Sequence, residues 1–168
     1  MKDGGKHIAY ISAGSNIGDK LSNCQKGFDS LGRLDSAVIL KQSPFYKTEP
    51  VDYTDQDWFV NVAAKIETGL EPLDLLRELK VIEKAVGRRK NAIRFGPRVL
   101  DLDIILYDDV VMESNGLCIP HPRMHQRRFV LQPICDMDPE AVHPVFNAKM
   151  RDLLENLGKG SQEVVPCC

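Results

Sequence analysis

The stretch from Val99 to Tyr107 constrains the fold more than any other part of the sequence. It contains Val, Leu, Ile and Tyr, which favour a half-buried strand, but positions 101 and 103 are Asp. Side chains alternate between the two faces of a strand. One face therefore carries the apolar row Leu100, Leu102, Ile104 and Leu106, and the other carries Asp101 and Asp103 together with Val99, Ile105 and Tyr107. The fold has to bury the first face and place two carboxylates on the second.

The rest of the chain alternates between strand-like and helix-like segments. Its 168 residues, 43% hydrophobic and 27% charged, suit one globular domain spanning residues 1–168 with a mobile tail from about residue 158. The predicted strands cover 7–14, 37–48 with an interruption at Pro44, 58–68 and 99–107, and the predicted helices follow Asp19, run from Pro72 to Gly87, and lie around 129–135 and 150–157. Residues 110–112 are expected to pair with the aspartate strand as a hairpin. This order predicts an α+β sandwich, with helices covering an antiparallel-rich sheet.

Charge and composition argue against several classes of partner. The net charge is −2 and the pI is near 6.1, so no electrostatic attraction to nucleic acid or to anionic membranes is expected. The start of the chain is polar, without the apolar segment of a signal peptide, and we expect a cytoplasmic protein. The five cysteines are scattered without CxxC spacing, which is typical of reduced thiols rather than of a zinc site.

The two aspartates allow two interpretations. They could face solvent on an amphipathic strand, balanced by a surface patch of basic residues. Alternatively, they could hold magnesium, which binds one or two carboxylates together with the phosphates of a substrate. The segment before the strand supplies cations that suit phosphates, namely Arg88, Arg89, Lys90, Arg94 and Arg98. Gly96 and Pro97 restrict the backbone just before Arg98, which favours a metal–polyphosphate site, although the chain has neither a P-loop nor a GxGxxG motif.

The string RFGPRVLDLDIILYDD resembles the signature of the 6-hydroxymethyl-7,8-dihydropterin pyrophosphokinase family. Further matches follow the family's order along nearly the whole chain: AYISAGSNIGD, SPFYKTEPV, FVNVAAKIET, LKVIEKAVGR and IPHPRMHQRRFVLQPICDMDP. The resemblance implies a ferredoxin-like α+β fold. It also implies transfer of pyrophosphate from ATP to the hydroxymethyl group of a dihydropterin, with release of AMP, and a requirement for two magnesium ions. We expect a monofunctional enzyme, since the sequence shows no dihydropteroate synthase or aldolase domain.

The resemblance also implies roles for individual residues on the ATP side. Asp101 and Asp103 correspond to the magnesium ligands, and with Arg88 and Arg98 they form the expected catalytic set. The residues expected to bind ATP are Lys80, Glu83, Arg88, Lys90, Arg98, His121 and Arg127. Lys80 stands where family members carry glutamine.

On the pterin side, the resemblance implies an aromatic slot and an amide that reads the edge of the ring. Phe95 and Phe129 would stack on the pterin, and Asn61 offers both a donor and an acceptor. The full set expected to bind pterin is Thr48, Pro50, Val51, Phe59, Asn61, Phe95 and Phe129. Phe59 and Phe95 stand where other members often carry tyrosine and tryptophan.

Two other functions remain open at the level of sequence. One is a different magnesium-dependent nucleotidyltransferase or nuclease that uses the same Asp-x-Asp pair. The other is a non-catalytic ferredoxin-like binding module, for instance for RNA, against which the acidic pI argues. We expect a monomer that binds ATP and dihydropterin and has no nucleic-acid or membrane partner.

Overall fold

The computed structural model describes residues 5–87, 94–158, 160 and 162–167. Its helices and strands, in chain order, are β1 (His7–Ser15), α1 (Lys20–Gly32), β2 (Ala37–Gln42), β3 (Tyr46–Thr48), β4 (Phe59–Thr68), α2 (Pro72–Val86), β5 (Asp101–Tyr107), β6 (Met112–Ser114), β7 (Leu117–Ile119), α3 (Arg128–Met137), β8 (Val142–His143), β9 (Ala148–Lys149), α4 (Met150–Asn156) and β10 (Val164–Pro166). A short 3₁₀ helix, Met124–Gln126, precedes α3.

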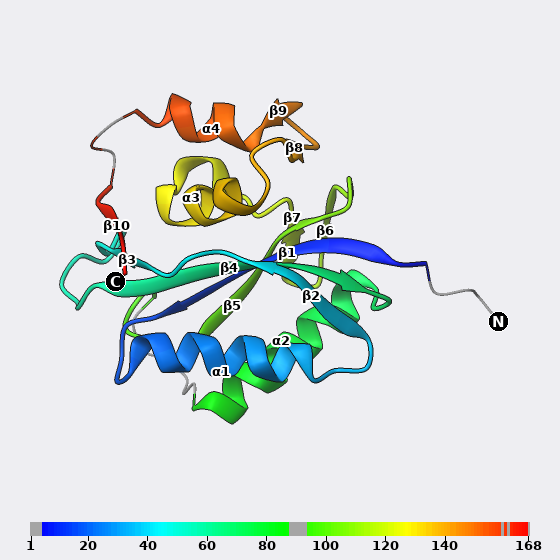
Figure 1. Cartoon of the computed structure of the whole chain (residues 1–168), viewed down its shortest axis with the longest axis horizontal. Coiled ribbons are helices and arrows are strands. Elements are labelled where there is room, and N and C mark those ends of the chain that lie inside the picture. Colours follow the sequence, from blue (N-terminus) through cyan, green and yellow to red (C-terminus); the bar gives the residue numbers. More distant parts are fainter. Residues whose placement is uncertain (1–4, 88–93, 159, 161, 168) are drawn as a thin grey trace.

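Six of the strands form one antiparallel sheet in the order β10-β3-β4-β1-β5. The sixth strand, β2, pairs with the second half of β4, beyond the part that pairs with β3. The predicted interruption at Pro44 separates β2 from β3, because proline cannot donate to a strand ladder. Figure 1 shows α1 and α2 on one side of the sheet and α3 and α4 on the other. The predicted ferredoxin-like α+β sandwich is confirmed.

The face under α1 and α2 is a closed apolar core. Asp19 caps α1, its carboxylate accepting the backbone N–H of Ser22, and Gly87 ends α2 with a φ of 122°. Alternate residues of β1, β4 and β5 pack against the two helices, among them Ile11, Val62, Leu100, Leu102 and Ile104. The apolar row predicted for the aspartate strand therefore faces α1 and α2 as far as Ile104.

The second core lies between the sheet and α3 and α4. It includes Tyr10, Ala63, Ile105 and Leu106 from the strands and Leu131 and Ile134 from α3. The register between β1 and β5 shifts between Tyr10 and Ile11, so that Ile105 is bulged out of the pairing. The bulge moves Leu106 to this core and Tyr107 to the core under α1 and α2, and the faces predicted for these two residues were therefore wrong.

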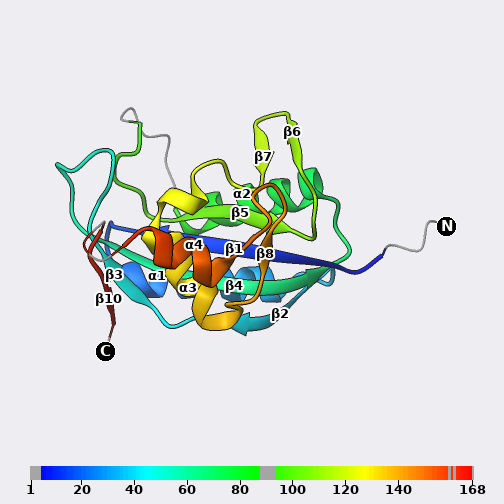
Figure 2. The same cartoon turned by 90° about the horizontal axis from the view of Figure 1, so that it is seen from above.

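Two further predictions from the sequence need correction. Met112–Ser114 pairs with β7 and not with β5, because Asn115 and Gly116 adopt φ values of 50° and 81° and form a tight turn. This β6–β7 hairpin projects away from the sheet (Figure 2). The segment after residue 158, predicted to lack regular structure, contains β10, which pairs with β3 at the sheet edge. Its mobility stays a prediction. No helix in the described ranges is long and apolar enough to cross a membrane.

Candidate active site

A cavity opens on the face of the sheet that carries α3, beside the core of that face. It encloses about 620 Å³ of empty space, part of it open to solvent. Its lining comes from β1, β3, β4, β5, the start of α3 and two loops, and consists of Ser12, Gly14, Thr48, Glu49, Val51, Asp52, Phe59, Asn61, Phe95, Gly96, Arg98, Asp101, Asp103, Arg127 and Phe129. The strand periodicity that buries Leu100 and Leu102 turns both aspartates into this cavity.

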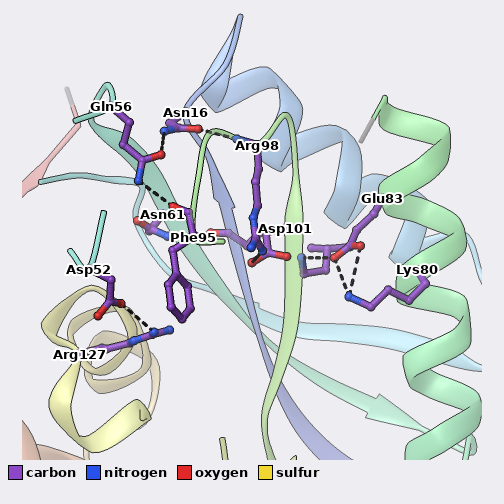
Figure 3. Close-up of polar contacts among 12 residues, drawn as sticks. Asn16, Asp52, Gln56, Asn61, Lys80, Glu83, Phe95, Arg98, Asp101 and Arg127 are labelled. Carbon is purple, nitrogen blue, oxygen red and sulfur yellow. Dashed lines mark hydrogen bonds and ion pairs between the residues drawn. The ribbon is translucent and has the colours of Figure 1, made fainter. Parts of the chain in front are cut away.

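The two carboxylates differ in their surroundings. Asp101 forms an ion pair with Arg98, whose Nη1 lies 3.0 Å from Oδ2 (Figure 3). Burial, followed by the charge of Asp101, raises the pKa of Asp103 from its ordinary value of 3.8 to about 7. A buried carboxyl next to another carboxylate is stabilised in its charged form by a cation. The pair therefore suits a divalent cation that shares its remaining coordination with phosphate oxygens.

Arg127 connects the cavity to a second group of charges. Its guanidinium contacts the carboxylate of Asp52 at 3.3 Å, and Arg123 contacts the same carboxylate at 3.4 Å. The Arg127 guanidinium also lies 5.9 Å and 5.5 Å from the ring centres of Phe95 and Phe129. One side chain thus lies near both aromatic residues expected to hold a pterin and carries a charge suited to phosphate. Figure 3 shows Arg127 between Asp52 and Phe95.

The amide of Asn61 is held at the floor of the cavity. Thr48 donates its hydroxyl to Oδ1 of Asn61 at 2.6 Å, and both residues are buried. Gly14 lies against the same amide, and a Cβ at position 14 would be 2.8 Å from Nδ2 of Asn61. The absence of a side chain at Gly14 therefore leaves the space that the Asn61 amide occupies. A fixed amide in a cavity with aromatic walls can read the donor and acceptor edge of a flat heterocycle.

Several residues predicted for the site lie elsewhere. Glu83 is 1% exposed, and its Oε1 accepts the backbone N–H of Leu102 at 2.8 Å. This bond ties α2 to the free edge of β5, so Glu83 supports the aspartate strand instead of lining the cavity. The Nζ atom of Lys80 lies 3.4 Å from both carboxylate oxygens of Glu83.

His121 and Pro50 are neighbours of the lining rather than part of it. The backbone N–H of His121 donates to the carbonyl of Ile105, and its Nδ1 accepts the N–H of Arg123. Burial and the charge of Arg127 lower the pKa of His121 to about 4, so the ring is neutral at pH 7. Pro50 sits between two lining residues without lining the cavity itself. Arg88 and Lys90 lie outside the described residues.

Two residues at the cavity rim were missed from the sequence. Asn16 and Gln56 hydrogen-bond to each other and to the backbone of the loop before β5, Asn16 at Arg98 and Gln56 at Phe95 (Figure 3). Asn16 follows β1 directly in the sequence Gly-Ser-Asn, which reads as ordinary turn chemistry. Only the approach of three segments distant in sequence reveals what these amides bind.

The sequence matches a known protein family over most of its length. The profile of the 7,8-dihydro-6-hydroxymethylpterin-pyrophosphokinase family matches residues 10–139. The chain belongs to this family. It is 41% identical over 131 residues to the 2-amino-4-hydroxy-6-hydroxymethyldihydropteridine pyrophosphokinase of Bacillus subtilis, covering 78% of each protein. The resemblance found in the sequence is therefore confirmed.

Other members of the pyrophosphokinase family are much longer. Folic acid synthesis protein fol1 of Schizosaccharomyces pombe is 44% identical over 150 residues, which cover 89% of this chain but 20% of that protein. This chain thus spans about a fifth of the length of that relative. A crystal structure of Plasmodium falciparum HPPK-DHPS with pterin and p-hydroxybenzoate has the same fold, with a TM-score of 0.72 at 17% identity, over 93% of this chain and 44% of the other.

Proposed function

We propose that this chain transfers the diphosphoryl group of ATP to the hydroxymethyl group of 6-hydroxymethyl-7,8-dihydropterin and releases AMP. The observation that carries the proposal is the composition of one cavity. It combines a fixed amide and aromatic side chains, which suit a pterin, with the β5 carboxylates Asp101 and Asp103 and two arginines, which suit a metal-bound polyphosphate. Membership of the pyrophosphokinase family and the name of the Bacillus subtilis relative support the same reaction.

The pterin would lie on the Asn61 side of the cavity. The Asn61 amide, fixed by Thr48, would pair with the amide and amino edge of the ring. Phe95 and Phe129 would stack on its faces, while Phe59, Val51 and Pro50 would complete the pocket around it. Stacked aromatic rings add favourable offset geometry to the apolar area that they bury, so this half of the site supplies affinity and orientation.

The phosphates of ATP would lie between Asp101, Asp103 and the arginines. Arg98 and Arg127 line the cavity. We include Arg88, Lys90, Lys80 and His121 in the proposed nucleotide site, with Glu83 framing it through its bond to β5. Asp101 and Asp103 fit magnesium, since their carboxylates share one strand face and one cavity, and we propose that they hold two ions. When bound, these ions neutralise phosphate charge.

The chemistry is an in-line substitution at the β-phosphorus of ATP. The hydroxyl oxygen of the pterin forms a bond to that phosphorus, and the bond from the phosphorus to the oxygen bridging to the α-phosphate breaks. AMP leaves with the electron pair, and the hydroxyl proton passes to a base or to solvent. The protein's part is to position both substrates and to stabilise charge, which is what catalysis of phosphoryl-type transfer requires.

We further propose that residues 1–168 act as one pyrophosphokinase domain and as a cytoplasmic monomer. The residues that line the cavity fall between Ser12 and Phe129, within the region that matches the family profile.

Product analysis tests the proposed function. Purified protein is incubated with ATP, magnesium chloride and 6-hydroxymethyl-7,8-dihydropterin, and the nucleotides are separated by ion-exchange chromatography. We expect AMP and the pterin diphosphate in equal amounts, with no AMP when the pterin is left out. ADP as the nucleotide product would indicate transfer of a single phosphoryl group and would contradict the proposal.

A further inference from the structure

Asn16 links the end of β1 to the two loops that border the cavity. Its Oδ1 accepts the backbone N–H of Arg98 at 2.8 Å, and its own backbone N–H donates to the carbonyl of Arg98 at 3.0 Å. Its Nδ2 donates to Oε1 of Gln56 at 2.9 Å and to the carbonyl of Asp57 at 3.2 Å. The residue is 4% exposed, so this amide is buried and its hydrogen bonds to several segments are protected from water.

Gln56 extends this hydrogen-bond network from Asn16 to Phe95. Its Oε1 accepts from Asn16, and its Nε2 donates to the carbonyls of Phe95 at 2.8 Å and Tyr53 at 2.6 Å. Both hydrogens of each side-chain amide can therefore be used, and each amide oxygen accepts a bond. Figure 3 shows this chain of bonds running from Arg98 through Asn16 and Gln56 to Phe95.

The backbone to which Asn16 and Gln56 bind is not in a relaxed conformation. Phe95 has a φ of 58°, in the left-handed region that a residue with a Cβ seldom adopts. Such a conformation persists only where the surroundings hold it, and here Gln56 binds the Phe95 carbonyl. Two residues later comes Pro97, and Arg98 follows with both its N–H and its C=O bound to Asn16.

We propose that Asn16 and Gln56 are positioning residues. They fix the position of Phe95, on the aromatic side of the cavity, relative to that of Arg98. The inference rests on the proposed function, in which Phe95 stacks on the pterin and Arg98 serves the ATP phosphates. Gln56 acts on the pterin side alone, through the Phe95 carbonyl. Asn16 acts on both sides, through Arg98 directly and through Phe95 by way of Gln56.

This arrangement predicts an asymmetry that a purely structural role would not produce. Gln56→Ala should raise the KM for pterin about tenfold, the effect of losing one or two hydrogen bonds, and change the KM for ATP by less than about threefold. Asn16→Ala should raise both KM values about tenfold. The double variant should be no worse than Asn16→Ala, because Gln56 loses its anchor when Asn16 is removed.

Asn23 provides a matched control. Its side-chain amide also donates to a backbone carbonyl, that of Ile17 at 2.9 Å, and to the hydroxyl of Ser15, but it contacts neither cavity loop. Asn23→Ala should keep both KM values and kcat of the wild type. Thermal melting of all four variants reports stability separately from the KM values.

The experiment is steady-state AMP formation by the wild type and these variants, with titration calorimetry of pterin binding to Gln56→Ala. The asymmetry described above supports the inference. It is overturned if Gln56→Ala binds and uses pterin like the wild type, or if its two KM values rise equally. If Asn16→Ala does not fold, Gln56→Ala alone decides by the same two criteria. A wild type that makes no AMP would overturn the proposed function instead, which keeps the two failures distinct.

Discussion

The two faces of the sheet are built from the same strands, yet one is closed and the other opens into a cavity. Under α1 and α2, Leu100 just before β5 and the inward positions Leu102 and Ile104 of β5 are apolar and buried. Under α3 the same strand presents Asp101 and Asp103 to the cavity before Ile105 joins the second core. Adjacent residues of one strand thus have different surroundings, a closed core on one face and, on the other, the cavity that we propose as the active site.

This division shows how a strand can carry charges that would be costly in a core. The leucines hold β5 to the helices, and the buried Glu83 carboxylate satisfies the N–H of Leu102 at its free edge. The aspartates are therefore not needed to keep the strand in place. If this account is right, changes to adjacent residues should affect either activity or stability, and seldom both.

The largest effect should come from Asp103→Asn, which removes one charge and keeps the side-chain volume. We expect the rate of AMP formation to fall about 10³-fold, because stabilisation of phosphate charge depends on the carboxylate pair. Raising the magnesium concentration should not restore the rate. Asp109→Asn, in the exposed turn after β5, is the control and should keep normal turnover. Full activity of Asp103→Asn would mean that the two aspartates do not form part of the active site.

Leu102→Ala, one residue away, should have the opposite effect. The fully buried side chain packs under α1 and α2, and its truncation should lower the free energy of unfolding by about 2–5 kcal/mol. Below the melting temperature, kcat should stay within about threefold of the wild type, since the face that carries the chemistry is unchanged. Urea denaturation measures the loss, with Leu40→Ala on exposed β2 as the control. A stable but inactive Leu102→Ala would mean that the two faces are not separable.

Phe95→Ala sharpens the comparison within the cavity itself. Loss of one stacking surface should weaken pterin binding by about 1–3 kcal/mol while ATP binding changes little. Calorimetric titration of each ligand makes the measurement. Phe146→Ala, which truncates a half-exposed ring on the β8–β9 hairpin, should leave both affinities unchanged. Equal losses of affinity for the two ligands would mean that Phe95 has a structural role and does not contact the pterin.

The smallest effect concerns pH and stability. Burial and the charge of Asp101 raise the pKa of Asp103 to about 7, from an ordinary value of 3.8. Between these two values the folded protein keeps a proton that the unfolded chain has lost, so the stability contributed by this group falls as pH rises. Without magnesium, the stability of Asp103→Asn relative to the wild type should therefore increase as pH rises to about 7. A difference that does not vary with pH would count against a raised pKa.

Much of the fold could be predicted because the relevant signals are local. Asp19 and Gly87 mark helix ends, Pro44 splits a strand, and alternation places the aspartates opposite the leucines. The β6–β7 hairpin had a usable signal in Asn115-Gly116, which the expected pairing of residues 110–112 with the aspartate strand overlooked. The bulge at Ile105 and the pairing of β10 depend on partners far along the chain, and no local pattern marks them.

The site divides in the same way. The aspartate strand and the family resemblance that it carries pointed to Asn61, Phe95, Arg98, Asp101, Asp103, Arg127 and Phe129, and all of them line the cavity. Whether each binds the ligand predicted for it stays a prediction. Asn16, Gln56 and the Asp52 carboxylate that pairs with Arg127 could not be found in this way, because their partners come from other segments. The structural use of Glu83 was hidden for the same reason, since its partner is a backbone N–H of β5.

The fate of the β-phosphate tests the central claim most directly. ATP labelled with ³²P at either the β- or the γ-phosphorus is incubated with the protein, magnesium and 6-hydroxymethyl-7,8-dihydropterin, and the pterin product is isolated. The account predicts that both labels move to the pterin with equal efficiency and that the nucleotide left behind carries neither. Transfer of the γ label alone would mean attack at the terminal phosphorus, and it would contradict diphosphoryl transfer by this site.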